Sequence, residues 1–240
     1  MNFWSRFPDN RLLAEASLWS ADFTRLGEEI ERVDAHVDLY HFDASDAHFV
    51  PGLLFFPDLV AALRPLTRRP FHVHLMTDDP LSLVDDFADA GADMITVHAE
   101  NGPRVPAALE KITRRGLAAG LAFGVDMPLA SLASSLETIS VVLLMGTPMG
   151  VKGKDLSPLA AQRITEARAI LARHGADKTV KIESDGGIRT TTIAALCEAG
   201  TQLIVMGSLA FQSKDIAGAM AWVKSLQGSF SPAKGESLPI

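Results

Sequence analysis

Eight short runs rich in apolar and β-branched residues recur along the chain, and helix-like segments separate them. The predicted strands cover residues 16–20, 39–43, 71–75, 94–98, 118–123, 141–145, 180–184 and 203–207. Amphipathic segments such as 22–35, 80–92, 104–116 and 157–175 lie between them, and several end in Ala-Gly or His-Gly. A glycine just past the last periodic residue commonly ends a helix. The alternation therefore predicts parallel strands joined by right-handed helical crossovers.

The number of repeats selects the architecture. Eight strand–helix units in 240 residues favour an α/β fold of the (β/α)₈ TIM barrel type. A doubly wound open sheet is the alternative. No linker or low-complexity segment divides the chain, so we predict a single domain over residues 1–240. Residues 228–240 lack periodicity and are predicted to form a loose tail.

Charge and cysteine content narrow the class of protein. The formal net charge is −7, with no basic footprint, so we expect no nucleic-acid partner. The single cysteine, Cys197, lies in a helical pattern and fits a buried thiol in a reducing compartment. No apolar run has the length of a signal peptide or a membrane span. We therefore expect a cytoplasmic protein without a membrane partner.

Histidines and aspartates gather at the predicted strand ends. His41 and Asp43 are two residues apart on one strand, so both side chains point to the same face. His74 lies near the end of the next strand, and Asp185 ends the seventh. Because active sites of such barrels lie at the carboxyl ends of the strands, these four side chains are expected to converge. Two imidazoles and two carboxylates suit zinc, manganese or iron better than magnesium.

Each residue taken alone also has a structural explanation. A histidine facing a core is usually a hydrogen-bonded structural residue, and an aspartate at a strand end often caps the following helix. From periodicity alone, metal binding and a structural role both stay open. His48 and Asp46 lie beyond the predicted strand, where capping of the loop or support of the ligands from outside is the expected role.

Glycine-rich turns follow the last two predicted strands. Gly186 and Gly187 lie in "SDGGI", and Gly207 and Ser208 lie in "VMGSLAF". The loops after strands seven and eight often bind phosphate in TIM barrels, because glycine lets backbone N–H groups approach an anion. The alternative is that these glycines only permit tight turns. Two such turns in succession favour a phosphate site, and the loop "GTPMGVKGK" could close over it.

The chain resembles the ribulose-phosphate 3-epimerases. The resemblance runs from about residue 17 to about residue 226, in the segments "SLWSADFTRLGEEI", "YHFDASDAHFVPG", "FHVHLM", "FADAGADMITVHAE", "ESDGGI" and "AGTQLIVMGSLAF". It implies a TIM barrel that binds one divalent metal ion, with zinc expected first and manganese, iron or cobalt as alternatives. The implied metal ligands are His41, Asp43, His74 and Asp185.

The resemblance also implies how the substrate is bound and converted. Asp43 and Asp185 would act as acid and base on opposite faces of an enediolate, which the metal ion stabilises. Contacts to a small phosphorylated sugar would come from Ser17, His74, Gly150, Val151, Lys152, Gly153, Gly186, Gly187, Gly207 and Ser208. The default reaction interconverts D-ribulose 5-phosphate and D-xylulose 5-phosphate, and a homo-oligomer is expected.

Some positions depart from the family pattern. The family loop "NPGFGGQ" reads "PMGVKGK" here, which puts Lys152 where the family has glycine. This change predicts a preference for another ketose phosphate, such as D-allulose 6-phosphate. A metal-dependent aldolase or isomerase and a non-catalytic sugar-phosphate binding protein are the other functions left open. Retention of both aspartates argues against the binding protein.

Overall fold

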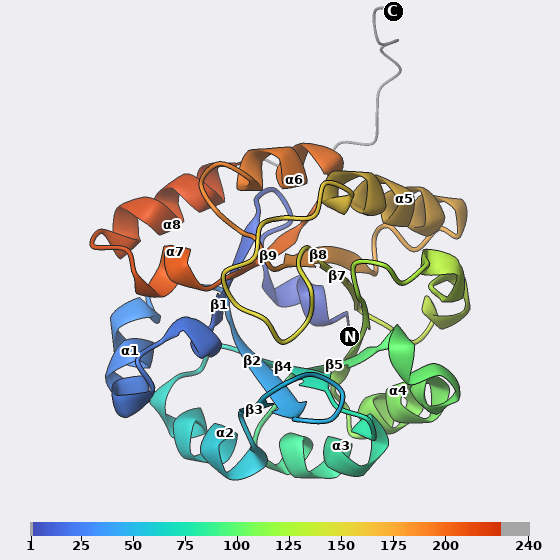
Figure 1. Ribbon diagram of the computed structural model, residues 1–240, viewed down its shortest axis with the longest axis horizontal. Coiled ribbons are helices and arrows are strands. Elements are labelled where there is room, and N and C mark those ends of the chain that lie inside the picture. Colours follow the sequence, from blue (N-terminus) through green and yellow to red (C-terminus); the bar gives the residue numbers. More distant parts are fainter. Residues whose placement is uncertain (1, 227–240) are drawn as a thin grey trace, which may run out of the picture.

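The computed structural model describes residues 2–226, and these form a closed barrel of eight parallel strands (Figure 1). The barrel strands are β1 (Leu13–Ser17), β2 (Leu39–Asp46), β4 (Phe71–Met76), β5 (Met94–His98), β6 (Ala118–Phe123), β7 (Val141–Met145), β8 (Lys181–Asp185) and β9 (Leu203–Met206). Pairing of β1 with both β9 and β2 closes the sheet. The TIM-barrel prediction is confirmed. The predicted loose tail at 228–240 lies outside the described residues.

Helices form a ring around the barrel (Figure 1). They are α1 (Leu26–Val33), α2 (Pro57–Leu63), α3 (Pro80–Asp89), α4 (Val105–Arg114), α5 (Ala160–Arg173), α6 (Ile193–Ala199), α7 (Ser208–Phe211) and α8 (Ile216–Ser225). The connection from β6 to β7 departs from the repeat, because it contains the 3₁₀ turns Leu129–Ser131 and Ala133–Ser135 in place of an α-helix. Pro128 and several serines explain this. Serine hydroxyls compete for backbone groups, as when Ser134 Oγ–H donates to the Ser131 carbonyl at 2.8 Å.

The first strand begins earlier than the sequence pattern predicts. It starts at Leu13, which pairs with Leu203, and the predicted residues Leu18–Ser20 form a 3₁₀ turn instead. The charged Glu15 interrupts the apolar run and conceals this strand start. A second unexpected element is β3 (Leu53–Leu54), which pairs antiparallel with the end of β2.

An N-terminal 3₁₀ turn, Phe3–Arg6, closes the amino-terminal end of the barrel. Its Trp4 is buried against residues at the starts of the strands, namely Leu13, Leu39, Met94, Ala118, Val141 and Leu203. The indole Nε1–H donates to the Ser140 carbonyl at 2.6 Å, which satisfies the polar end of the ring. Within residues 2–226, the carboxyl end of the strands is therefore the end of the barrel left open for a ligand.

Helix α6 buries the single cysteine. Cys197 is 4% exposed, and burial raises the pKa of its thiol to about 11. A buried thiol that stays protonated is not a nucleophile at neutral pH. Within residues 2–226, no helix combines the length and the hydropathy that a membrane crossing requires.

Candidate active site and metal centre

Four predicted ligands converge at the carboxyl end of the barrel, and we call His41, Asp43, His74 and Asp185 the rim cluster. Asp43 Oδ1 lies 3.3 Å from both His41 Nε2 and His74 Nδ1. Asp185 Oδ2 lies 3.9 Å from His41 Nε2 and 3.8 Å from His74 Nδ1. Four ligands arranged tetrahedrally at zinc distances lie roughly 3.3–3.6 Å apart, so the donor atoms are already near the spacing of such a site.

Buried groups without partners support the same conclusion. Both histidine side chains of the rim cluster have no exposed surface, and Asp185 keeps 15%. Among the described residues, His41 Nε2 has no hydrogen-bond partner. A buried polar atom left unsatisfied is costly, and a divalent ion among these donors would satisfy it. The donor set therefore fits a divalent metal ion.

A hydrogen-bonded relay fixes the orientation of His74. Glu100 Oε2 accepts from His98 Nδ1–H at 3.1 Å, which leaves His98 Nε2 as an acceptor. His74 Nε2 lies 2.7 Å from that atom and so donates to it. The lone pair of His74 then sits on Nδ1, which faces the rim cluster. This is the tautomer that a metal ligand requires.

The two aspartates of the rim cluster differ in their ionisation. Burial opposes the ionised form of Asp43, but the adjacent His41 and His74 hold the pKa of its carboxyl well below its usual range. Burial, together with the negative charge of Asp43, raises the pKa of Asp185 to about 7. Two neighbouring carboxyls with pKa values pushed apart are the usual arrangement for paired acid and base roles.

A second polar cluster lies deeper in the barrel, and sequence reasoning did not assign it. We call Glu15, His72 and Glu183 the inner cluster, because all three are completely buried beside His41. Burial opposes the ionisation of Glu15, but contact with His72 outweighs it and lowers the pKa of this carboxyl. For Glu183, burial and the negative charge of Glu15 raise the pKa to about 8. The available signal was spacing: each of these residues lies two positions before a site residue on the same strand.

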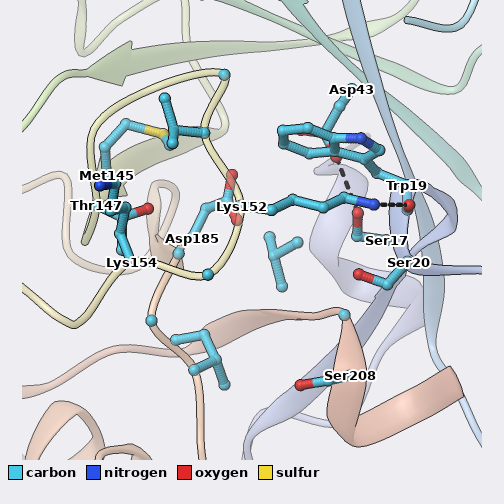
Figure 2. Close-up of a pocket in the computed structure, with 18 of the residues that line it drawn as sticks. Ser17, Trp19, Ser20, Asp43, Met145, Thr147, Lys152, Lys154, Asp185 and Ser208 are labelled. Atoms are coloured by element: carbon cyan, nitrogen blue, oxygen red, sulfur yellow. Dashed lines mark hydrogen bonds between the residues drawn. The ribbon is translucent and has the colours of Figure 1, made fainter. Parts of the chain in front are cut away.

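A cavity of about 420 Å³ opens above the rim cluster (Figure 2). Its walls include both aspartates and every predicted substrate contact except His74, namely Ser17, Gly150, Val151, Lys152, Gly153, Gly186, Gly187, Gly207 and Ser208. Ser17 Oγ–H donates to Asp43 Oδ2 at 2.8 Å, which orients that carboxylate. The volume suits a small molecule such as a sugar phosphate.

Glycine is required on geometric grounds in the turn after β8. Gly186 and Gly187 have φ of +89° and +72°, in the left-handed region that other residues rarely adopt. A Cβ on Gly186 would lie 2.2 Å from Thr147 Oγ1. The turn alone thus explains these glycines, and their place on the cavity wall is what supports an anion contact.

The loop between β7 and α5 lies across the mouth of the barrel (yellow in Figure 1). In it, Lys152 extends across the cavity toward Trp19, and its Nζ–H donates to the Trp19 carbonyl at 2.5 Å (Figure 2). The ammonium lies 4.8 Å from the centre of the Trp19 ring, a cation–π contact. Burial lowers the pKa of Lys152, against the opposing effect of Asp43. Lys152 is thus exposed to solvent and also contacts Trp19 at the cavity.

Asp46, the last residue of β2, caps the loop that contains His48. Asp46 Oδ1 accepts from the backbone N–H groups of His48 and Phe49, each at 2.8 Å. Asp46 Oδ2 accepts from the Asp78 N–H at 2.8 Å. The predicted capping role is confirmed for Asp46, whereas His48 contributes a contact of its Nδ1 with the Asp46 carbonyl.

Sequence comparison identifies relatives over most of the chain. The profile described as "Ribulose-phosphate 3 epimerase family" matches residues 13–211. A ribulose-phosphate 3-epimerase of Synechocystis sp. is 36% identical over 89% of this chain and 94% of its own length. The enzyme of that name from Bacillus subtilis (strain 168) is 35% identical over 83% of this chain and 92% of its own length. The one from Escherichia coli (strain K12) is 36% identical over 85% of this chain and 90% of its own length.

Solved structures with the same architecture are more distant in sequence. A 3-hexulose-6-phosphate synthase from Salmonella typhimurium superposes with a TM-score of 0.63 at 15% identity, over 90% of this chain and 98% of that one. KGPDC from Streptococcus mutans superposes with a TM-score of 0.65 at 16% sequence identity, over 90% of this chain and 97% of that one. These similarities show the fold alone. The sequence relatives go further, and by them the chain belongs to the ribulose-phosphate 3-epimerase family, which places it among the isomerases.

Proposed function

We propose that this protein is a metal-dependent ketose-phosphate 3-epimerase that interconverts D-ribulose 5-phosphate and D-xylulose 5-phosphate. One observation carries the proposal: Asp43 from β2 and Asp185 from β8, strands separated by β1 and β9, meet at one cavity beside His41 and His74. Epimerisation next to a ketone needs one group to remove the C3 proton and another to deliver a proton to the other face.

The rim cluster would hold one divalent ion, with zinc as the first expectation and manganese, iron or cobalt as alternatives. His41 Nε2, His74 Nδ1 and one oxygen of each aspartate are the donors. When bound, the ion supplies positive charge that stabilises the enediolate formed by loss of the C3 proton.

The protein's own residues carry the proton transfers. Asp43 is the ionised carboxyl, and Ser17 fixes the direction of its second oxygen. Asp185 is the second carboxyl on the cavity wall, and it is placed to deliver the other proton. The two roles exchange with the direction of reaction, because each carboxyl receives a proton in one direction and gives one in the other.

The remaining wall of the cavity would bind the phosphate. The turns after β8 and β9 and the loop after β7 all contribute to this wall, through Gly186, Gly187, Gly207, Ser208, Gly150, Val151 and Gly153, and their backbone N–H groups are the proposed phosphate donors. Holding the phosphate away from the reacting carbon fixes the sugar between the aspartates. The direct test is conversion of ribulose 5-phosphate to xylulose 5-phosphate, followed by NMR with zinc or manganese added. Carbon–carbon cleavage products instead of the epimer would indicate an aldolase.

Lys152 is expected to set the order of substrate preference. Its ammonium lies on Trp19 within the cavity, where it occupies space and presents a cation to polar groups of the sugar. We expect wild type to convert ribulose 5-phosphate but to give a higher kcat/KM with another ketose phosphate, such as allulose 6-phosphate. Lys152→Gly should shift the ratio of kcat/KM values toward ribulose 5-phosphate by about tenfold. Lys154→Gly, in the same loop, is the control. A panel in which both proteins turn over ribulose 5-phosphate best would refute the shift.

A further inference from the structure

The inner cluster lies directly beneath the rim cluster, and His41 of the rim cluster contacts both. Its Nε2 faces the rim cluster, 3.3 Å from Asp43 Oδ1. Its Nδ1 faces inward, 3.5 Å from Glu15 Oε1 and 3.8 Å from Glu183 Oε1. Among the described residues neither nitrogen has a hydrogen-bond partner, and both face carboxylates, which only accept hydrogen bonds. A metal ion bound to Nε2 would need the lone pair there, which puts the proton of the neutral imidazole on Nδ1, where Glu15 and Glu183 are the acceptors within reach.

Glu15 is the better anchored of the two inner carboxylates. Its Oε1 lies 2.9 Å from His72 Nδ1, and His72 Nε2 lies 2.6 Å from Thr96 Oγ1. Neither oxygen of Glu183 has a hydrogen-bond partner among the described residues. A continuous hydrogen-bonded chain therefore runs from Thr96 through His72 to Glu15, and it ends against His41.

The packing around this chain leaves Thr96 little freedom. A Cβ added at Gly120, on the neighbouring strand β6, would lie 1.9 Å from Thr96 Oγ1. Glycine at this position gives the threonine hydroxyl room to stay directed at His72. Thr96, His72 and Glu15 are all completely buried, so solvent does not compete for these contacts.

We propose that Glu15 is a positioning residue for the metal centre, holding His41 in the orientation and tautomer that direct Nε2 at the ion. The inference rests on the proposed metal dependence but adds a role that the rim cluster alone does not contain. Ligand histidines commonly donate their second N–H to a carboxylate, and loss of such a partner lowers metal affinity by about 10- to 100-fold. In this barrel the carboxylate comes from β1, a strand that contributes no predicted metal ligand.

The test compares two variants in which the same substitution, glutamate to glutamine, is made at each inner carboxylate. Glu15→Gln and Glu183→Gln each replace a buried inner carboxylate by its amide. We expect Glu15→Gln to weaken zinc binding by about 10- to 100-fold in a chelator competition, and Glu183→Gln to change it by less than about threefold. In cobalt-loaded protein, Glu15→Gln should also shift the d–d absorption bands, because the donor strength of His41 changes. Circular dichroism confirms that each variant is folded.

The outcomes separate the two claims. Wild type that binds no divalent ion would refute the proposed metal dependence itself. Equal zinc affinity and cobalt spectra in wild type and Glu15→Gln would overturn the positioning role alone. Two ions per wild-type chain, falling to one in both variants, would also overturn it by showing that the inner cluster is a second metal site. If Glu15→Gln does not fold, Glu15→Asp carries the test: the shortened carboxylate should still lower affinity, and unchanged affinity contradicts the proposal.

Discussion

Asp43→Asn and Asp185→Asn are each expected to lower kcat by about a thousandfold or more. Each carboxyl has two functions in the proposed site, as a metal ligand and as a proton carrier, and an amide can perform neither well. The change in shape is small, since asparagine is isosteric with aspartate. The loss should therefore appear in kcat, with folding unchanged, and it is measured by initial rates at saturating substrate with excess metal ion.

Ser17→Ala is the matched control for these variants. Ser17 lines the same cavity and orients Asp43 through one hydrogen bond, but it carries no proton in the proposed reaction. Loss of one hydrogen bond to a charged carboxylate costs roughly 1.5–3 kcal/mol, so a decrease of about 10- to 150-fold is expected, smaller than that of the asparagine variants. If either asparagine variant retained turnover within about tenfold of wild type, the acid and base roles of the two aspartates would be wrong.

His74→Ala is expected to remove most of the bound metal. The variant deletes one of four donors and also breaks the relay to His98 and Glu100. Because loss of an outer partner alone costs about 10- to 100-fold in affinity, loss of a ligand should cost more than about 100-fold. Protein purified without a histidine tag should contain about one divalent ion per chain as wild type and less than about a tenth of that as His74→Ala.

His48→Ala controls for loss of a histidine near the cavity. His48 lies in the capped loop after β2, outside the rim cluster, and its ring contacts the Asp46 carbonyl. The His48→Ala protein should contain as much metal as wild type. Equal metal in wild type and His74→Ala would show that the ion binds somewhere other than the rim cluster.

Period-two spacing on the strands predicted much of this site from sequence. His41 with Asp43, and the position of His74, follow from the alternation of side chains along a buried strand. Their convergence required the additional assumption of a closed barrel, which the repeat number favoured. The structure brings all of the predicted site residues to one rim and one cavity.

Other features depend on contacts that no local pattern encodes. Glu15 looked like an interruption of β1 because its partner His72 is 57 positions away. The role of Trp4 at the amino-terminal end of the barrel depends on six strand starts spread over the chain. The direction of Lys152 depends on Trp19, which lies 133 positions earlier. Short-range periodicity predicts which face a side chain occupies, but not what it meets there.

The central claim, two-carboxyl epimerisation at C3, is tested most directly in deuterated water. Wild type with its metal ion is incubated with ribulose 5-phosphate, and xylulose 5-phosphate from the first turnovers is analysed by NMR and mass spectrometry. Because one aspartate removes the C3 proton and the other delivers a solvent-derived one, we predict product carrying about one deuterium, at C3, with no carbon–carbon cleavage. Xylulose 5-phosphate that retains the original hydrogen at C3, or substrate that neither exchanges nor epimerises, would contradict the account.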